Sequence, residues 1–330
     1  MELKTQNRLK LLAVNAQVIK KEFAWHNVLT KRLAALLYAQ ADRPVDCEAI
    51  RSCHNLIKSS TGAFSAFRGN MSLCVAALLS LSPDPQTLIA ETLKVYNLLK
   101  AAKLRSSDYL VVAAYQIAAQ TDPANHTNAV HRTRAFFDSM KTYHFFYTGQ
   151  DDYIFAAMLG LTDLDAAGSA ERIEQIYKRL KSEFWDRNSV QALAQVLMLG
   201  ENPAEAANRV LALQDALRAR RIRLDKPYTL PVLGVLALLP VEINTIVRDI
   251  AEAQMFLRLQ KGFGVFWVTT QELLLFAAAI VAAEYADSVK DGVLTAALST
   301  GITNIIIAQQ AAMIAAISAS STAAASSSGN

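Results

Sequence analysis

The sequence predicts an all-α fold, either a helical-repeat solenoid or an α/α ring of about seven antiparallel helix pairs. The first reason is a turn signal, SLSPDP at residues 80–85, whose variants recur along the chain. Their spacings are 38 to 41 residues, and a near-constant period of this length indicates stacked repeats. The aligned positions are Ala41, Ser82, Thr121, Thr162, Gly200 and Leu239.

The second reason is the alternation of two kinds of helical segment. One kind is short and almost wholly apolar, as in SLCVAALLSL and YIFAAMLGL, and should form a buried inner layer. The other is longer and amphipathic: Ile173, Ile176, Tyr177 and Leu180 follow helical spacing, so we expect Tyr177 and Leu180 in the core. A sustained alternation with period two, the signature of strands, is missing from the sequence.

These patterns divide the chain into one domain, residues 1–319. Within it we expect a leading helix at residues 1–29, six helix-pair units at 30–270 and a terminal hydrophobic helix pair at 271–319. That last pair departs from the pattern and should cap the stack or bind a second copy. The Ser/Ala-rich tail at 320–330 is too polar and simple to bury a core and is predicted to be disordered.

Composition limits the classes of function. The chain has 330 residues, with 33 basic against 29 acidic side chains and a formal net charge of +4, which disfavours a dedicated nucleic-acid-binding protein. Its three cysteines, Cys47, Cys53 and Cys74, fall in or near apolar helical stretches and suit reduced thiols. We therefore expect a cytoplasmic protein.

The C-terminal segment is the one candidate for a membrane span. Charged residues are absent after Asp291, but Thr, Asn and Gln recur through the apolar run, which disfavours a transmembrane helix. We instead expect residues 292–318 to pack against the helix at 271–287 or across a homodimer.

Candidate site residues lie in the junctions between units, which should gather at one end of the stack. His144, Asp151 and Asp152, in HFFYTGQDDY, are weak catalytic candidates, since paired carboxylates can share a proton or hold a cation. Arg68 and Tyr228 are weak ligand-binding candidates. Arg68 would pair with an anionic group of the ligand, and the hydroxyl of Tyr228 would orient the ligand. The plainer interpretation is helix capping by Ser107, Asp151, Asn188 and Thr229.

Familiar catalytic signals are missing from the sequence. We find no Walker-type phosphate loop, dinucleotide fingerprint or nucleophile elbow, and we expect no cofactor. His126 and His131 are five residues apart, which misses the spacing of two metal ligands on one helical face, so we expect no metal site. The run from Arg218 to Arg223 is interpreted as a solvated helix end.

Four strings resemble a bacterial family, found mainly in Firmicutes, that is known only as a domain of unknown function. They are RGNMSLCVAALLS, MKTYHFFYTGQDDYIFAAML, FWDRNSVQALAQVLML and IIIAQQAAMIAAI, and the likeness runs from about residue 5 to 318. In that family a proline and a leucine typically follow the histidine, whereas Phe145 and Phe146 stand here, which weakens a catalytic role for His144. The resemblance implies a cytoplasmic bacterial protein and no particular activity.

Three functions remain open at this point. The first is a non-enzymatic helical-repeat binding or scaffold protein whose partner is a protein, a peptide or a second copy held through the C-terminal helices. The alternative is an α/α-ring enzyme, or an ion or small-molecule binder, with its site at the junction loops. The third is a peripheral membrane or polyanion-associated protein.

Overall fold

The computed structural model describes residues 1–144, 148–288 and 303–315. All regular secondary structure in these ranges is helical, which confirms the all-α prediction. Several predictions concern residues outside the described ranges: the tail at 320–330, parts of the C-terminal segment at 292–302 and 316–318, and the pair Phe145 and Phe146.

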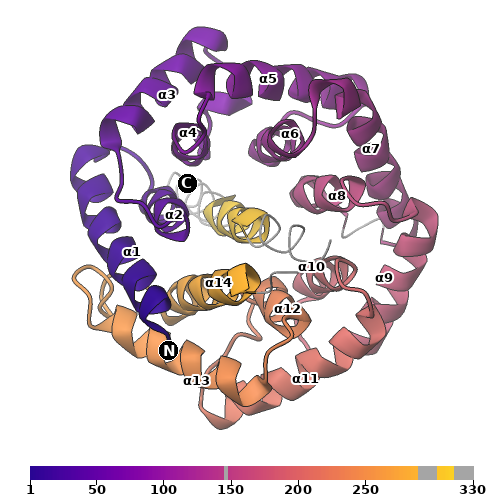
Figure 1. Ribbon diagram of the computed structural model, residues 1–330. Helices are drawn as coiled ribbons and strands as arrows, with labels where there is room; N and C mark the ends of the chain where they lie inside the picture. The colour runs from indigo at the N-terminus through magenta and orange to yellow at the C-terminus, as the bar shows by residue number, and fades with distance from the viewer. Residues whose placement is uncertain (145–147, 289–302, 316–330) are drawn as a thin grey trace, which may run out of the picture.

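The helices form two concentric layers arranged in a circle (Figure 1). The outer layer contains α1 (Leu3–Glu22), α3 (Cys47–Ser60), α5 (Pro85–Ala101), α7 (His126–Tyr143), α9 (Ala166–Leu180), α11 (Pro203–Ala219) and α13 (Ile243–Arg258). The inner layer contains α2 (Val28–Gln40), α4 (Ser72–Ser80), α6 (Asp108–Gln120), α8 (Tyr153–Gly160), α10 (Arg187–Leu197), α12 (Leu230–Leu238) and α14 (Thr270–Ser288). Short 3-10 helices are η1 (Ala66–Arg68), η2 (Pro123–Asn125) and η3 (Gln150–Asp152).

The recurring turn signal marks the start of outer helices. Asp84 accepts a hydrogen bond from the Thr87 N–H at 3.0 Å, and Pro85 is the first residue of α5. Asn202 caps α11 in the same way, again with a proline in first position. A side-chain oxygen at this position satisfies a backbone N–H that has no partner inside the helix, and proline has no N–H to lose there. Asp46 and Asp165 cap α3 and α9 likewise, whereas α7 and α13 begin without a side-chain cap. The period near 40 residues is thus the spacing of the starts of the outer helices.

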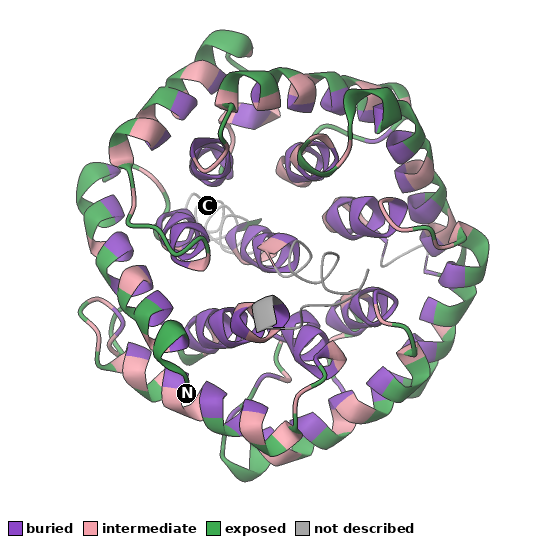
Figure 2. Ribbon diagram, in the orientation of Figure 1, coloured by how far each residue is buried: buried purple, intermediate pink, exposed green. Residues whose placement is uncertain are grey.

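Burial separates the two layers (Figure 2). Every residue of α4 and α8 is buried, because these helices are covered on all sides. Outer helices bury one face and expose the other. In α9 the buried face includes Tyr177 and Leu180, which confirms that both are core residues.

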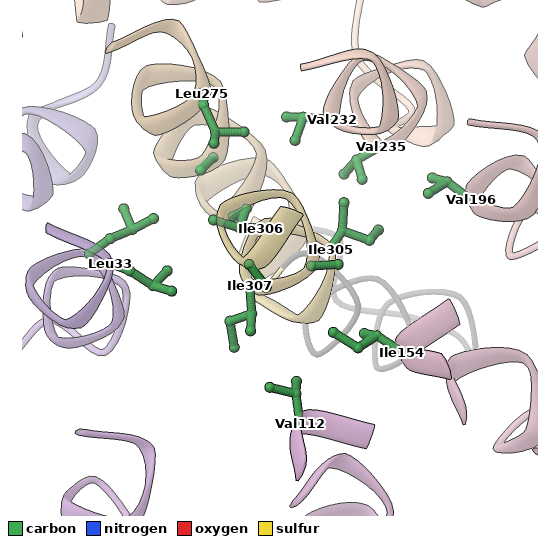
Figure 3. Close-up of a cluster of buried hydrophobic side chains, with 14 of the residues drawn as sticks. Leu33, Val112, Ile154, Val196, Val232, Val235, Leu275, Ile305, Ile306 and Ile307 are labelled. Carbon is green, nitrogen blue, oxygen red and sulfur yellow. The ribbon is translucent and has the colours of Figure 1, made fainter. Parts of the chain in front are cut away.

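A helix formed by residues 303–315 lies inside the circle. Its buried side chains include Ile305, Ile306 and Ile307, which lie among apolar side chains of several inner helices (Figure 3). Those labelled neighbours are Leu33, Val112, Ile154, Val196, Val232, Val235 and Leu275. This arrangement differs from the predicted cap at the end of a stack. Because inner helices are apolar on most faces, their innermost face also needs cover, and the chain supplies it.

The circle is closed where the beginning of the chain meets α13 and α14. Helix α1 contacts α13 and α14, and α14 also contacts α2. Two arginines join these elements across more than 230 residues of sequence. Arg8 pairs with Asp42 at 2.7 Å and with Glu284 at 3.3 Å, and Arg32 pairs with Glu272 at 2.9 Å. Both guanidinium groups are nearly buried, so each must be paired to offset the cost of leaving water.

A search of the described helices for a stretch long and apolar enough to cross a membrane found none. The apolar faces of α14 and of residues 303–315 are buried within the chain itself. Within the described residues, the C-terminal surface that the sequence suggested for binding a second copy is therefore covered by the chain itself.

We predict that Ile306→Ala lowers the free energy of unfolding by about 2 to 5 kcal/mol, because it leaves a cavity at the centre of the circle. Met313→Ala on the same helix is the control, since Met313 is only half-buried, and should cost clearly less. Urea unfolding followed by circular dichroism measures both. Equal losses for the two variants would contradict the central position of Ile306.

Candidate functional site

The predicted site residues lie on connections that run from an outer helix to the next inner helix. Because the two layers alternate along the chain, these connections share one end of the circle, here called the loop end. Within the described residues its segments are 23–27, 61–71, 102–107, 144 with 148–152, 181–186, 220–229 and 259–269. The opposite, turn end is formed by 41–46, 81–84, 121–125, 161–165, 198–202 and 239–242.

Asp152 is the centre of a buried polar cluster at the loop end. It is 4% exposed, at the end of η3 and directly before α8. Its Oδ2 accepts a hydrogen bond from the Gly149 N–H at 2.9 Å. Its Oδ1 accepts from the side-chain amides of Gln195, at 2.7 Å, and Gln191, at 3.2 Å. The Gln191 amide also donates to Thr148 Oγ1 at 3.1 Å.

This environment changes the acidity of Asp152. Burial disfavours the charged form and, with the nearby negative charge of Asp151, raises the pKa of Asp152 to about 7. The three hydrogen bonds act in the opposite direction but do not cancel the effect of burial. The carbonyl oxygens of Gln191 and Gln195 are buried and have no hydrogen-bond partner among the described residues. A protonated Asp152 needs an acceptor for its O–H, and these amide oxygens are of the right kind.

Asp151 and Tyr228 lie near this cluster on its more exposed side. Asp151 accepts a hydrogen bond from Asn188 Nδ2 at 3.0 Å. Tyr109, at the start of α6, lies close to both: burial raises the pKa of its phenol, and the negative charge of Asp151 adds to the effect. Asp151, Asp152, Tyr109 and Tyr228 therefore form the polar group that the loops bring together.

The other two candidates are turned toward different partners. The Nε2 of His144 lies 2.6 Å from a carboxylate oxygen of Glu174 in the outer helix α9, and its ring packs edge-to-face on Tyr177. Burial lowers the pKa of His144, against the effect of Glu174. The guanidinium of Arg68 donates to the carbonyls of Lys58 and Thr61, and so holds the end of α3. The structure thus gives His144 and Arg68 packing and capping contacts with the outer layer.

The capping interpretation holds for some residues and not for others. Ser107 caps α6 by accepting from the Leu110 N–H. For α10 the cap is Asp186 instead of Asn188, and Asp151 accepts from a side chain instead of a helix N–H. Thr229 uses its hydroxyl to donate to the carbonyls of Leu224 and Lys226.

Other places for a ligand are limited in the described chain. No group of three or more His, Cys, Asp or Glu side chains among the described residues could hold a metal ion. A hollow of about 220 Å³ lies at the turn end, between segments 200–209 and 237–240. That volume is below the usual size of small-molecule sites. Its Arg209 already donates to the carbonyls of Leu239 and Val241.

Comparison with protein-family models matches residues 15–311 to a family described as "Protein of unknown function (DUF4003)". The chain belongs to the DUF4003 family. The matched region includes the whole Asp152 cluster and most of the helix at residues 303–315. This agrees with the resemblance to a domain of unknown function that the sequence indicated. Neither the curated proteins nor the solved structures gave a match to this DUF4003 member.

Sequence reasoning missed the amides that surround Asp152. Gln191 and Gln195 are one helical turn apart in the otherwise apolar string VQALAQVLML, so they lie on the same face of α10. Two amides at this spacing in a buried helix need polar partners. That signal could have directed attention to them, although it could not have named Asp152 as their partner.

We predict that Asp152→Asn removes a pH-dependent component of stability. The pKa of Asp152 is raised in the folded state, so the folded protein keeps a proton that the unfolded chain has already released above pH 3.8. The free energy of unfolding of the wild type should therefore fall, by up to about 4 kcal/mol, as pH rises from about 4 through 7. The variant should lack this decrease, because asparagine does not titrate.

Urea unfolding at pH 5 and pH 8 measures the effect. Asp163→Asn, which changes an exposed carboxylate at the turn end, is the control and should keep the wild-type difference. If Asp152→Asn shows the same difference between the two pH values as the wild type, the carboxyl of Asp152 is not the titrating group.

Proposed function

We propose that this DUF4003 member is a non-enzymatic, cytoplasmic binding protein, built as an α/α ring of repeated helix pairs. The observation that supports this best is the filled centre. Ile305, Ile306 and Ile307 lie among the side chains of the inner helices where a ring-shaped enzyme could hold a substrate. An enzyme needs a concave pocket with converging polar groups. Here the centre is apolar and occupied by the chain itself.

The loop end offers a surface for binding. Large aromatic side chains such as Trp25, Phe64 and Trp185 are almost fully exposed there. Exposed apolar side chains that are concentrated in one region of a protein indicate an interaction site. Tryptophan and phenylalanine also bury much apolar area when they bind, which makes them frequent anchors of interfaces. The binding function is therefore assigned to the loop end.

We predict that a photo-crosslinking amino acid at position 64 forms covalent adducts in cells that express the full chain. The same amino acid at position 163, an exposed site at the turn end, is the matched control and should not. Mass spectrometry of the adducts tells whether the partner is a protein or a lipid. Adducts of equal yield at both positions, or none at position 64, would contradict a binding function at the loop end.

A second candidate function is an enzyme or a small-molecule binder at the junction loops. The observation that favours it is the carboxyl of Asp152, whose pKa of about 7 suits proton transfer near neutral pH, with the phenols of Tyr109 and Tyr228 nearby. Strongly shifted acids of this kind are found at active sites, but also in purely structural polar clusters.

A thermal-shift screen against metabolites and divalent cations tests this second function. A ligand of the site raises the melting temperature of the wild type by mass action, and should not do so in Asp152→Asn. Tyr228→Phe, which removes one hydroxyl at the edge of the cluster, should reduce the shift. Stabilisation that survives both substitutions would place the ligand elsewhere and exclude this site.

A further inference from the structure

We propose that the loop end binds the surface of a lipid bilayer that contains anionic lipids. This inference rests on the proposed binding function and specifies its partner. Two independent features of the loop end support it: its exposed aromatic side chains, and a segregation of charge between the two ends of the circle.

The exposed aromatic side chains come from several loops. The exposed fractions are 100% for Trp25, 105% for Phe64, 93% for Trp185, 95% for Phe266 and 63% for Trp267. A folded protein normally covers most of such surface. Trp25, Trp185 and Trp267 are the three tryptophans of the sequence. Tryptophan is the side chain that prefers the boundary between lipid headgroups and acyl chains, where its ring is half in water.

The positions of these side chains suit a flat surface. The loops that carry Trp25 and Trp267 are adjacent. The Nζ of Lys20, in the last turn of α1 before Trp25, lies 4.6 Å from the centre of the Trp267 ring, and Arg32 in α2 donates a hydrogen bond to the Trp267 carbonyl. Trp185 follows α9, which lies across the circle from α1 and α2 (Figure 1). Anchors on both sides of the circle allow the whole loop end to lie against one plane, whereas a peptide would need a continuous groove.

Charge is divided between the two ends. The turn-end segments are acidic: Arg43 is the one basic residue within them, and the guanidinium groups of Arg132 and Arg209 reach them from α7 and α11. Their exposed carboxylates include Asp84, Asp122, Asp163, Asp165, Glu201 and Glu242. Loop-end segments carry mostly basic side chains, with Lys103, Arg105, Lys181, Arg221, Lys226 and Lys261 exposed. Of the acidic loop residues, Asp186 caps α10 and Asp225 binds Arg218 and Arg223, whereas Glu183 is exposed. The small net charge of the sequence conceals this division.

A basic end with protruding aromatic rings matches an anionic bilayer in both respects. Lysine and arginine are attracted to the negative surface potential, and aromatic and aliphatic side chains then enter the headgroup region. Val265 and Leu259, also exposed at this end, would gain from the apolar boundary but could not contact a nucleic acid or a polar peptide favourably. No helix needs to cross the membrane in this arrangement, so it agrees with the described helices.

The experiment uses the full chain and vesicles. Because all three tryptophans lie at the loop end, intrinsic fluorescence reports on that surface alone. Vesicles of phosphatidylcholine with phosphatidylserine should shift the tryptophan emission to shorter wavelength and protect it from an aqueous quencher. Vesicles of phosphatidylcholine alone should leave it unchanged, and high salt should reverse the anionic effect.

Matched variants locate the contact. Phe64→Ala combined with Phe266→Ala keeps all tryptophans and should weaken vesicle binding at least about tenfold. Lys181→Glu with Lys261→Glu should weaken it by at least about tenfold as well, because each basic residue near an anionic surface contributes about fivefold. Leu3→Ala and Asp163→Lys change exposed residues toward the turn end and should bind as the wild type does. Unchanged thermal melts show that the variants are folded.

The outcomes separate this inference from the proposed function. Wild-type binding to anionic vesicles that both loop-end variants lose supports it. Equal binding to neutral vesicles, wild-type affinity in both loop-end variants, or an equal fluorescence shift with a single-stranded oligonucleotide would overturn it. A protein adduct at position 64 without vesicle binding would also overturn it, but would leave the binding function intact. If neither adducts nor vesicle binding occur, both are wrong.

Discussion

The burial of three consecutive isoleucines, Ile305, Ile306 and Ile307, is the interaction on which the rest of the structure depends. Inner helices such as α4 and α8 are apolar around their whole circumference, so a circle of them leaves an apolar surface at its centre. Water there would cost roughly 25 cal/mol for each Å² left uncovered. The helix at residues 303–315 covers this surface from within the same chain. This helix is therefore a core element without charged residues, in which Asn304, Gln309 and Gln310 are also buried.

Closure of the circle places a second demand on the chain. Helices α1 and α2 must contact α14, and nearly buried ion pairs of Arg8 and Arg32 form at these contacts. Such pairs contribute little net stability, since desolvation offsets most of their attraction, but an unpaired member is strongly unfavourable. They therefore select the correct neighbour more than they strengthen the contact. A wrongly registered closure would bury Glu272 or Glu284 without a cation.

Local signals predicted much of the fold and little of the site. Helical periodicity was sufficient to assign Tyr177 and Leu180 to the core, and turn residues such as Ser107 capped helices as expected. The capping role failed for Asn188 because α10 begins two residues earlier, after the cap Asp186. It failed for Thr229 because its hydroxyl, although at the N-cap position of α12, donates to the carbonyls of Leu224 and Lys226. The contact partners of the site residues could not be predicted from the sequence. His144 contacts Glu174, and Asp152 contacts Gln195, only because separate helices pack together. The position of residues 303–315 likewise depends on the completed circle.

The central helix also changes how the molecule should come apart. In an open array of repeats each unit contacts only its neighbours, so unfolding can begin at one terminus and spread stepwise. Residues 303–315 instead lie among side chains of α2, α6, α8, α10, α12 and α14, and so give distant units a common neighbour. Losing any one unit exposes that helix, which weakens the contacts of the others. We therefore expect the described chain to unfold as one cooperative unit and not unit by unit from a terminus.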